Sequence, residues 1–225
     1  MGNFTLLGLR LAVYLLASLF VGLAIREYTR AWVTARLGDP TPRLWGRITL
    51  QPRAWFDPFG SGFVPALIAL LWAVQLLMLP AAYAKPAPID PNNLRRHPRD
   101  LILASLAGPG ASLALGIVAG LLIRTGVLGG DLLLAVVTFA YVNASLCIFH
   151  LLPVPGLDGA RLVAMLLPPH ARELYRNADR YLALFVLVIL FVLLTTLFSI
   201  VAVFAGAICN AASGVSCLPL LQFPT

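Results

Sequence analysis

Apolar residues are gathered into long stretches along this chain, separated by short polar segments. Five stretches cover residues 4–25, 61–83, 101–124, 131–152 and 181–208. A membrane-spanning helix needs roughly 20 predominantly apolar residues, so each stretch is long enough to cross a bilayer. The pattern therefore predicts an all-α polytopic membrane protein.

The connecting segments are rich in proline and glycine. Segments 38–42 and 85–88 are typical of turns. Residues 43–50 instead alternate polar and apolar side chains, which predicts a short β-hairpin at the membrane surface. No appended soluble domain is expected. We predict a single integral membrane domain over residues 1–210, followed by a short C-terminal tail over residues 211–225.

Composition supports a membrane environment. The chain is 60% hydrophobic and only 11% charged, and its mean hydropathy is +0.90. A soluble domain of 225 residues has no interior large enough to hide that much apolar surface. No small-residue cleavage site precedes Arg26, so we expect the first stretch to remain as a helix. The lipid bilayer is the first expected partner.

The formal net charge of +7 does not indicate a nucleic-acid partner. The basic residues lie between the apolar stretches, where they orient a membrane protein, rather than in one stripe with interleaved aromatic side chains. If all five stretches crossed the membrane, the basic residues of 43–53 and 85–99 would fall on opposite sides. The usual excess of positive charge on the cytoplasmic side would then nearly vanish.

A re-entrant segment over residues 61–83 restores that excess, because both basic groups then share one side with the basic residues of 161–180. Three residues interrupt the stretch: Pro65, Gln75 and Pro80. Broken backbone at membrane depth is tolerated where protein covers it. We therefore predict re-entry, with the basic loops in the cytoplasm and the N-terminus and tail outside.

Three cysteines are present, without CxxC or zinc-ribbon spacing, so no thiolate metal site is indicated. Cys147 lies inside an apolar stretch and is predicted to be a core residue. Cys209 and Cys217 lie in or beside the tail. If the tail faces an oxidising compartment, these two cysteines can form a disulfide that closes a small loop containing Gly214.

Two motifs are more specific than composition. Residues 25–32 read IREYTRAW, and residues 149–161 read FHLLPVPGLDGAR. Further motifs lie between them: LGDP at 37–40, GRITLQP at 46–52, DPFG at 57–60, KPAPIDPNNLR at 85–95 and LAGPGAS at 106–112. In order and spacing these resemble the bacterial branch of the site-2 protease family of intramembrane zinc metalloproteases. Several linked motifs over residues 10–170 are far more specific than one HExxH.

The resemblance implies a zinc site that this chain lacks. In the family's HExxH motif, two histidines on one helical face bind zinc and the glutamate acts as general base. Arg26 and Arg30 stand at the histidine positions, Glu27 at the general-base position and Asp158 at the third ligand position. A guanidinium has no lone pair for a metal and stays protonated. We therefore expect no catalytic residue, a vestigial Glu27, and no metal or other cofactor.

Three further residues are expected to line the former substrate cleft: Ser112, Asn143 and His150. Ser112 and His150 stand where the family has asparagines that help to orient the substrate segment, so their presence fits relaxed catalytic constraint. His150 could approach Asp158 and Glu27, but two neighbouring arginines would repel a cation. We expect His150 to be a hydrogen-bonded lining residue.

Together these features predict a non-proteolytic site-2 protease homologue in a bacterial plasma membrane, which binds a transmembrane segment or a partner membrane protein. Two alternatives stay open. One is a structural accessory subunit of a membrane complex. The other is an active intramembrane zinc metallopeptidase with an unusual ligand set and zinc as its cofactor.

The arginines also predict a specific contact. Removing zinc alone would leave Glu27 and Asp158 close together and poorly solvated. Arg26 and Arg30 are four residues apart, so they project from the same helical face, and each guanidinium can donate two parallel hydrogen bonds to a carboxylate. We predict an ion pair between Arg26 or Arg30 and Asp158, with a separation within about 4 Å.

Overall fold

The computed structural model describes residues 6–73, 80–168 and 196–221. The elements in chain order are α1 (Leu6–Arg36), α2 (Thr41–Leu44), α3 (Pro52–Trp55), the π-helix η1 (Pro58–Phe63), α4 (Val64–Ala73), the 3₁₀ helix η2 (Pro91–Asn93), α5 (Arg99–Arg124), α6 (Gly130–Leu151), α7 (Asp158–Leu166), α10 (Thr196–Ser213) and α11 (Cys217–Leu221). These residues contain helices and no strand. The all-α prediction is confirmed.

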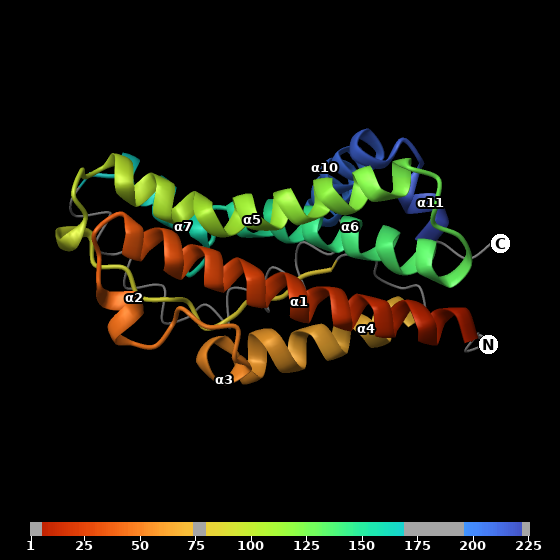
Figure 1. Cartoon of the computed structure of the whole chain (residues 1–225), viewed down its shortest axis with the longest axis horizontal. Helices are drawn as coiled ribbons and strands as arrows, with labels where there is room; N and C mark the ends of the chain where they lie inside the picture. Colours follow the sequence, from red (N-terminus) through yellow and green to blue (C-terminus); the bar gives the residue numbers. More distant parts are fainter. Residues whose placement is uncertain (1–5, 74–79, 169–195, 222–225) are drawn as a thin grey trace.

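Three helices form the frame of the molecule. α1, α5 and α6 contain 31, 26 and 22 residues, which corresponds to roughly 46, 39 and 33 Å at 1.5 Å per residue. The hydrocarbon core of a bilayer is about 30 Å thick, so each helix is long and apolar enough to cross it. They run side by side along the long axis, and α10 lies against α5 and α6 (Figure 1). Residues 181–195 of the fifth apolar stretch lie outside the described residues.

Small residues allow the helices to approach closely. A Cβ added at Gly116 of α5 would lie 3.2 Å from the carbonyl oxygen of Ala140 on α6. A Cβ added at Gly120 would overlap the side chain of Ala212 on α10. Within a membrane, helix association depends on such close packing, because lipid tails are as apolar as the side chains.

The stretch predicted to re-enter begins in a helix made of η1 and α4. Asp57 caps η1 by accepting hydrogen bonds from the backbone N–H groups of Phe59 and Gly60, at 3.0 and 2.7 Å. α4 follows η1 directly, so the described helix runs over Pro58–Ala73. Residues 74–79 lie outside the described part of the chain.

The two ends of this stretch lie side by side. The backbone N–H of Tyr83 donates to the carbonyl of Gly60 at 3.1 Å, and the hydroxyl of Ser61 donates to the carbonyl of Tyr83 at 2.8 Å. The N–H of Lys85 donates to the carbonyl of Trp55 at 2.8 Å. A Cβ at Gly60 would overlap the Tyr83 ring, so glycine is required for this contact. Residue 83 thus returns to the level of residue 60.

The predicted β-hairpin over residues 43–50 is wrong. The N–H groups of Leu44 and Trp45 donate to the carbonyls of Pro40 and Thr41, both at 3.0 Å, as in a helical turn. Pro42 lies in the first turn of α2, where its fixed φ favours a helix and its missing N–H is no loss. The backbone N–H groups that a strand would need for pairing therefore donate hydrogen bonds within this helical turn.

Arg47 explains part of the misleading alternation. Its side chain is buried, and Nη1 donates to the carbonyl of Ala54 and, at 3.3 Å, to the carbonyl of Lys85. A polar residue in the alternating pattern thus faces inward and joins two loops.

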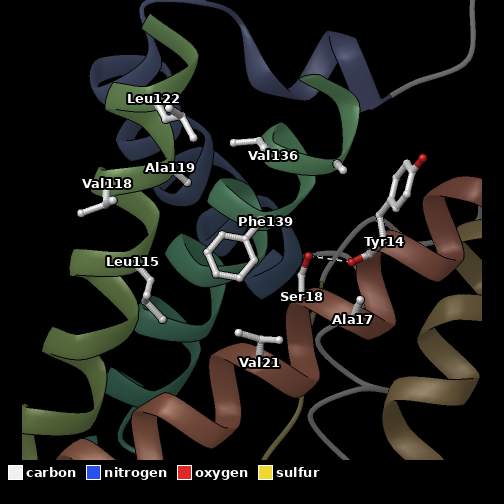
Figure 2. Close-up of a pocket in the computed structure, with 11 residues that line it drawn as sticks. Tyr14, Ala17, Ser18, Val21, Leu115, Val118, Ala119, Leu122, Val136 and Phe139 are labelled. Carbon is white, nitrogen blue, oxygen red and sulfur yellow. Dashed lines mark hydrogen bonds between the residues drawn. The ribbon is translucent and has the colours of Figure 1, made fainter. Parts of the chain in front are cut away.

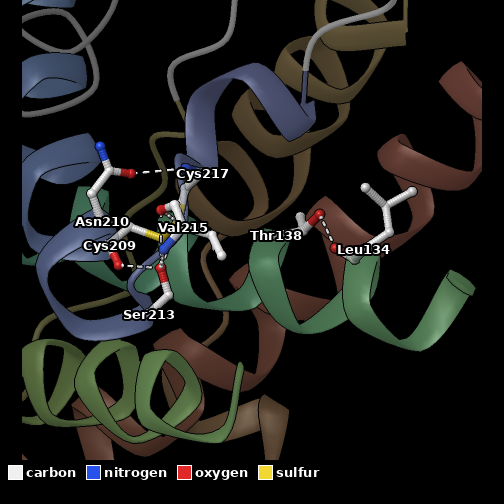
Figure 3. The surroundings of a disulfide bond; sticks show 7 residues. All are labelled: Leu134, Thr138, Cys209, Asn210, Ser213, Val215 and Cys217. Carbon is white, nitrogen blue, oxygen red and sulfur yellow. Dashed lines mark hydrogen bonds between the residues drawn. A yellow bond between two sulfur atoms is a disulfide. The ribbon is translucent and has the colours of Figure 1, made fainter. Parts of the chain in front are cut away.

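A disulfide closes the tail, as predicted. Cys209 in α10 and Cys217 in α11 are bonded, with their Cα atoms 6.2 Å apart. The side chain of Asn210 accepts a hydrogen bond from the N–H of Cys217 at 2.8 Å, beside the start of α11 (Figure 3). Gly214 turns the chain with a φ of +74°, a conformation that favours glycine. Cys147 is free and buried in the core, also as predicted.

Candidate functional site

The middle of α1 carries three charged side chains inside the protein. Arg26, Glu27 and Arg30 are each at most 3% exposed. The guanidinium of Arg26 lies against α5 at Gly108, where an added Cβ would come within 3.3 to 3.4 Å of the Arg26 side chain. The glycine before Pro109 therefore makes room for the arginine.

The fourth charged side chain is that of Asp158, the first residue of α7. The loop before it turns sharply: the N–H of Leu157 donates to the carbonyl of Val154 at 3.0 Å, and Gly156 has a φ of +91°. A Cβ at Gly159 would overlap the backbone of Leu151 at the end of α6. The Leu-Asp-Gly sequence therefore brings α7 back onto α6 and directs Asp158 toward α1.

These four side chains form a closed ring of ion pairs. Arg30 Nη1 donates to Asp158 Oδ1 at 2.8 Å, and Arg30 Nη2 donates to Glu27 Oε2 at 2.5 Å. Arg26 donates through Nη2 to Asp158 Oδ2 and through Nη1 to Glu27 Oε1. The predicted ion pair with Asp158 is present. Both arginines make it, whereas the prediction required only one.

Within the ring two positive and two negative groups balance, and Arg161 Nη1 lies 3.9 Å from Asp158 Oδ1 at its edge. Burying a charge without a partner is expensive, whereas here every carboxylate oxygen accepts from a guanidinium. Burial by itself would raise the pKa of Asp158, but the neighbouring Arg26 and Arg30 hold that pKa well below its usual range. Asp158 is therefore ionised, and the ring joins α1 to α7.

His150 is buried beside the ring, near the end of α6. Its Nδ1 lies 2.9 Å from the carbonyl oxygen of Leu146. A carbonyl only accepts, so Nδ1 carries the proton of this hydrogen bond. Nε2 is buried and has no hydrogen-bond partner among the described residues. The expected hydrogen bond of His150 is present.

Ser112 and Asn143 are also fully buried. The amide nitrogen of Asn143 donates to the carbonyl of Phe139 at 2.9 Å, and its Oδ1 would lie 2.7 Å from a Cβ added at Gly22. Asn143 thus packs between α6 and α1. That Ser112, Asn143 and His150 line a substrate cleft stays a prediction.

The ring does not fit a zinc ion. Zinc needs about four nitrogen, oxygen or sulfur lone pairs in tetrahedral arrangement. At this site two positions are guanidinium groups, and the carboxylate oxygens are taken by those groups. In the part of the chain that the structure describes, no cluster of three or more His, Cys, Asp or Glu side chains could hold a metal.

Asp39 has a structural role that the sequence analysis did not predict. It is buried and accepts hydrogen bonds from the N–H and hydroxyl of Thr41 at 2.9 and 2.5 Å, from the N–H of Asp90 at 2.7 Å and from the amide of Asn93 at 3.2 Å. Burial raises the pKa of Asp39, but these hydrogen bonds outweigh it and bring the pKa below its ordinary value. Its place in the LGDP motif was the only signal available.

Comparison with known proteins identifies the family. The chain is 30% identical over 201 residues to "Putative zinc metalloprotease YwhC" of Bacillus subtilis, a match that covers 85% of this chain and 86% of the relative. The chain belongs to the site-2 protease family. It is also 31% identical over 181 residues to "Putative zinc metalloprotease Rip2" of Mycobacterium tuberculosis, covering 79% of this chain and 66% of that protein. The Rip2 protein of Mycolicibacterium smegmatis is 25% identical over 183 residues.

Neither a protein-family model nor a solved structure matches the chain. The relatives and the three long apolar helices make this site-2 protease homologue a multi-pass integral membrane protein of bacteria. The names of these relatives refer to zinc metalloproteases.

Proposed function

We propose that this site-2 protease homologue is non-proteolytic and acts by binding a transmembrane segment or a partner membrane protein. The observation that carries the proposal is the closed ring of Arg26, Glu27, Arg30 and Asp158. The motif resemblance predicts the family's metal ligands at three of these positions, Arg26, Arg30 and Asp158. Two guanidinium groups cannot replace two imidazole ligands, because they have no lone pair to donate.

The general-base position is blocked as well. In a zinc peptidase the glutamate takes a proton from the metal-bound water. Here both oxygens of Glu27 accept hydrogen bonds from Arg26 and Arg30. Both carboxylate oxygens are therefore already held by the arginines, so Glu27 is not positioned to act on a bound water. In this proposal the protein keeps the helix packing around the site but does not hydrolyse peptide bonds.

The same proposal includes a re-entrant α4. Its support is the hydrogen bonding of Tyr83 to Gly60 and of Lys85 to Trp55. A segment whose ends are joined in this way returns to the membrane face from which it left. The basic residues of 43–53 and 85–99 then share one face.

One observation favours the alternative of an active metallopeptidase. His150 Nε2 is buried without a partner among the described residues, and both named relatives are called zinc metalloproteases. For zinc to bind at Nε2 near Asp158, however, the two arginines would have to leave the ring. An active and a non-proteolytic protein therefore give different results in a cleavage assay.

The test is cleavage of a membrane-embedded model substrate by the purified protein. We expect no cleavage product with the wild type, with Glu27→Gln, or with either protein after chelator treatment. Cleavage by the wild type that both the chelator and Glu27→Gln abolish would refute the non-proteolytic proposal. A partner role is tested by photocrosslinking from the exposed Val21 or Leu121 in native membranes, with Val127 in the turn after α5 as the control position.

A further inference from the structure

A groove of about 400 Å³ lies between α1, α5 and α6, away from the ring of charges. Its walls are α1 from Tyr14 to Val21, α5 from Leu115 to Leu122, and α6 from Ala135 to Phe139. Apart from Tyr14 and Ser18, every lining side chain is apolar. Figure 2 shows Phe139 in the middle of the groove, with side chains of α1 and α5 around it.

The hydroxyl of Ser18 needs no partner from a ligand. Ser18 Oγ donates to the carbonyl oxygen of Tyr14 at 2.6 Å, within its own helix (Figure 2). The wall therefore presents an apolar surface along its length. It favours a hydrocarbon occupant over a polar one.

The groove opens on the outer surface of the helix bundle. Val21, Val118 and Leu122 on its edges are 42%, 65% and 47% exposed. All three lie in helices that are long and apolar enough to cross a membrane. The groove is therefore open to the bilayer from the side.

The volume of the groove fits an acyl chain better than it fits a helix. A helix with its side chains is about 10 Å or more in diameter, so ten residues occupy roughly 1,200 Å³. The 400 Å³ of the groove is well below that figure. It falls in the range of small-molecule sites, which is about 300 to 1,000 Å³.

An ion pair closes one end of the groove. Arg10 lies one helical turn before Tyr14, and Asp131 lies one turn before Ala135, so both project from the groove faces of their helices. Arg10 Nη1 donates to Asp131 Oδ1 at 2.9 Å, and the two side chains are 52% and 61% exposed. A cation and an anion are thus both accessible at this end.

The distances along α1 match one leaflet of a bilayer. Arg10 and Val21 are eleven residues apart, or roughly 16 Å along a helix. Half of the hydrocarbon core is about 15 Å. If Arg10 lies at the headgroup boundary, the apolar groove covers the depth of a single leaflet.

We propose that this groove binds one acyl chain of a phosphatidylethanolamine molecule from that leaflet, with the headgroup at Arg10 and Asp131. The lipid phosphate pairs with the guanidinium of Arg10, and the lipid ammonium pairs with the carboxylate of Asp131. The zwitterionic headgroup therefore matches the two exposed charges, and the acyl chain covers the apolar walls.

The experiment is to measure the phosphatidylethanolamine that stays bound to the full chain purified in mild detergent. We expect one lipid per wild-type chain and its loss in Ala119→Phe, which fills the groove. The double variant Arg10→Ala/Asp131→Ala should bind the lipid about tenfold more weakly, since it lacks two charged contacts. Arg124→Ala is the control, because Arg124 is exposed at the same end but lies near Gly214. Its lipid content should equal that of the wild type.

A folded Ala119→Phe protein that keeps its lipid would overturn the proposal. If that variant does not fold, the double variant decides, because Arg10 and Asp131 are exposed and leave the packing intact. Unchanged binding of spin-labelled phosphatidylethanolamine by the double variant would equally overturn it. So would a cross-linked dimer formed through Val118→Cys in native membranes, since a second copy would then cover the groove.

Discussion

Arg26 and Arg30 each bridge two carboxylates, so they neutralise Glu27 and Asp158 together. Part of this arrangement could be predicted from the sequence, because a spacing of four residues places both guanidiniums on one face of a helix. That each arginine would contact both carboxylates could not be predicted. The symmetric ring depends on Gly108 and on the turn before Asp158, whose positions are set by tertiary packing.

Asp158→Ala should be strongly destabilising. Removing one partner of a buried ion pair leaves uncompensated charge and costs about 3 to 5 kcal/mol. The matched control is Asp131→Ala, whose ion pair with Arg10 is exposed and contributes at most about 1 kcal/mol. The free energy of unfolding in detergent, measured with denaturant, compares the two. If both variants lost the same free energy of unfolding, the ring would not be what holds α1 to α7.

Asp39 should make stability depend on pH. Its folded-state pKa is lowered by hydrogen bonds from Thr41, Asp90 and Asn93, so its contribution is present above its unfolded pKa of about 3.9 and is lost as the pH falls through the folded value. We expect the difference in melting temperature between wild type and Asp39→Asn to shrink as the pH falls below about 4. A difference that stays constant over this range would contradict the assignment.

Among the elements, the turn between α6 and α7 sets the position of Asp158. Gly159→Ala would force a Cβ into the backbone of Leu151 and move α7 away, at a cost of about 1 to 3 kcal/mol. Gly110→Ala in α5 is the control, because an added Cβ there meets nothing within 4 Å and alanine favours a helix by up to about 1 kcal/mol. Denaturant unfolding should separate the two variants in opposite directions. A neutral Gly159→Ala would contradict this account of the turn.

The long helices could be predicted from the sequence because their apolar runs far exceed what a turn requires. The conformation of residues 43–50 could not be predicted from the sequence. Its alternation has the period of a strand, but Pro42 starts a helical turn, and Arg47 faces inward to the carbonyls of two loops. Whether a polar residue in an alternating run faces water or buried backbone depends on tertiary contacts that the local pattern does not encode.

For the whole molecule, the predicted topology places residues 53 and 93 on the cytoplasmic side. Cysteines introduced at Arg53 and Asn93 should both resist a membrane-impermeant thiol reagent in intact cells. Val127→Cys, in the exposed turn between α5 and α6, should react and serves as the positive control. Cys147 is buried and the other two cysteines are bonded, so the background should be low. Labelling at residue 93 but not at residue 53 would mean that residues 61–83 cross the membrane.

Family membership and the bundle of long helices were predictable for the whole molecule, because linked motifs and apolar stretches extend along most of the chain. The groove between α1, α5 and α6 could not be predicted from the sequence. Its walls come from three segments of ordinary apolar sequence, and only their packing shows that the space between them is unfilled.

The most direct test of the central claim is the zinc content of the purified protein, measured by elemental analysis after exposure to stoichiometric zinc. We predict that the wild type retains no zinc, because Arg26 and Arg30 occupy the ligand positions. The double variant Arg26→His/Arg30→His, which restores the family motif beside Asp158, should retain zinc more tightly than the wild type. Stoichiometric zinc in the wild type, lost on Asp158→Asn, would contradict the account.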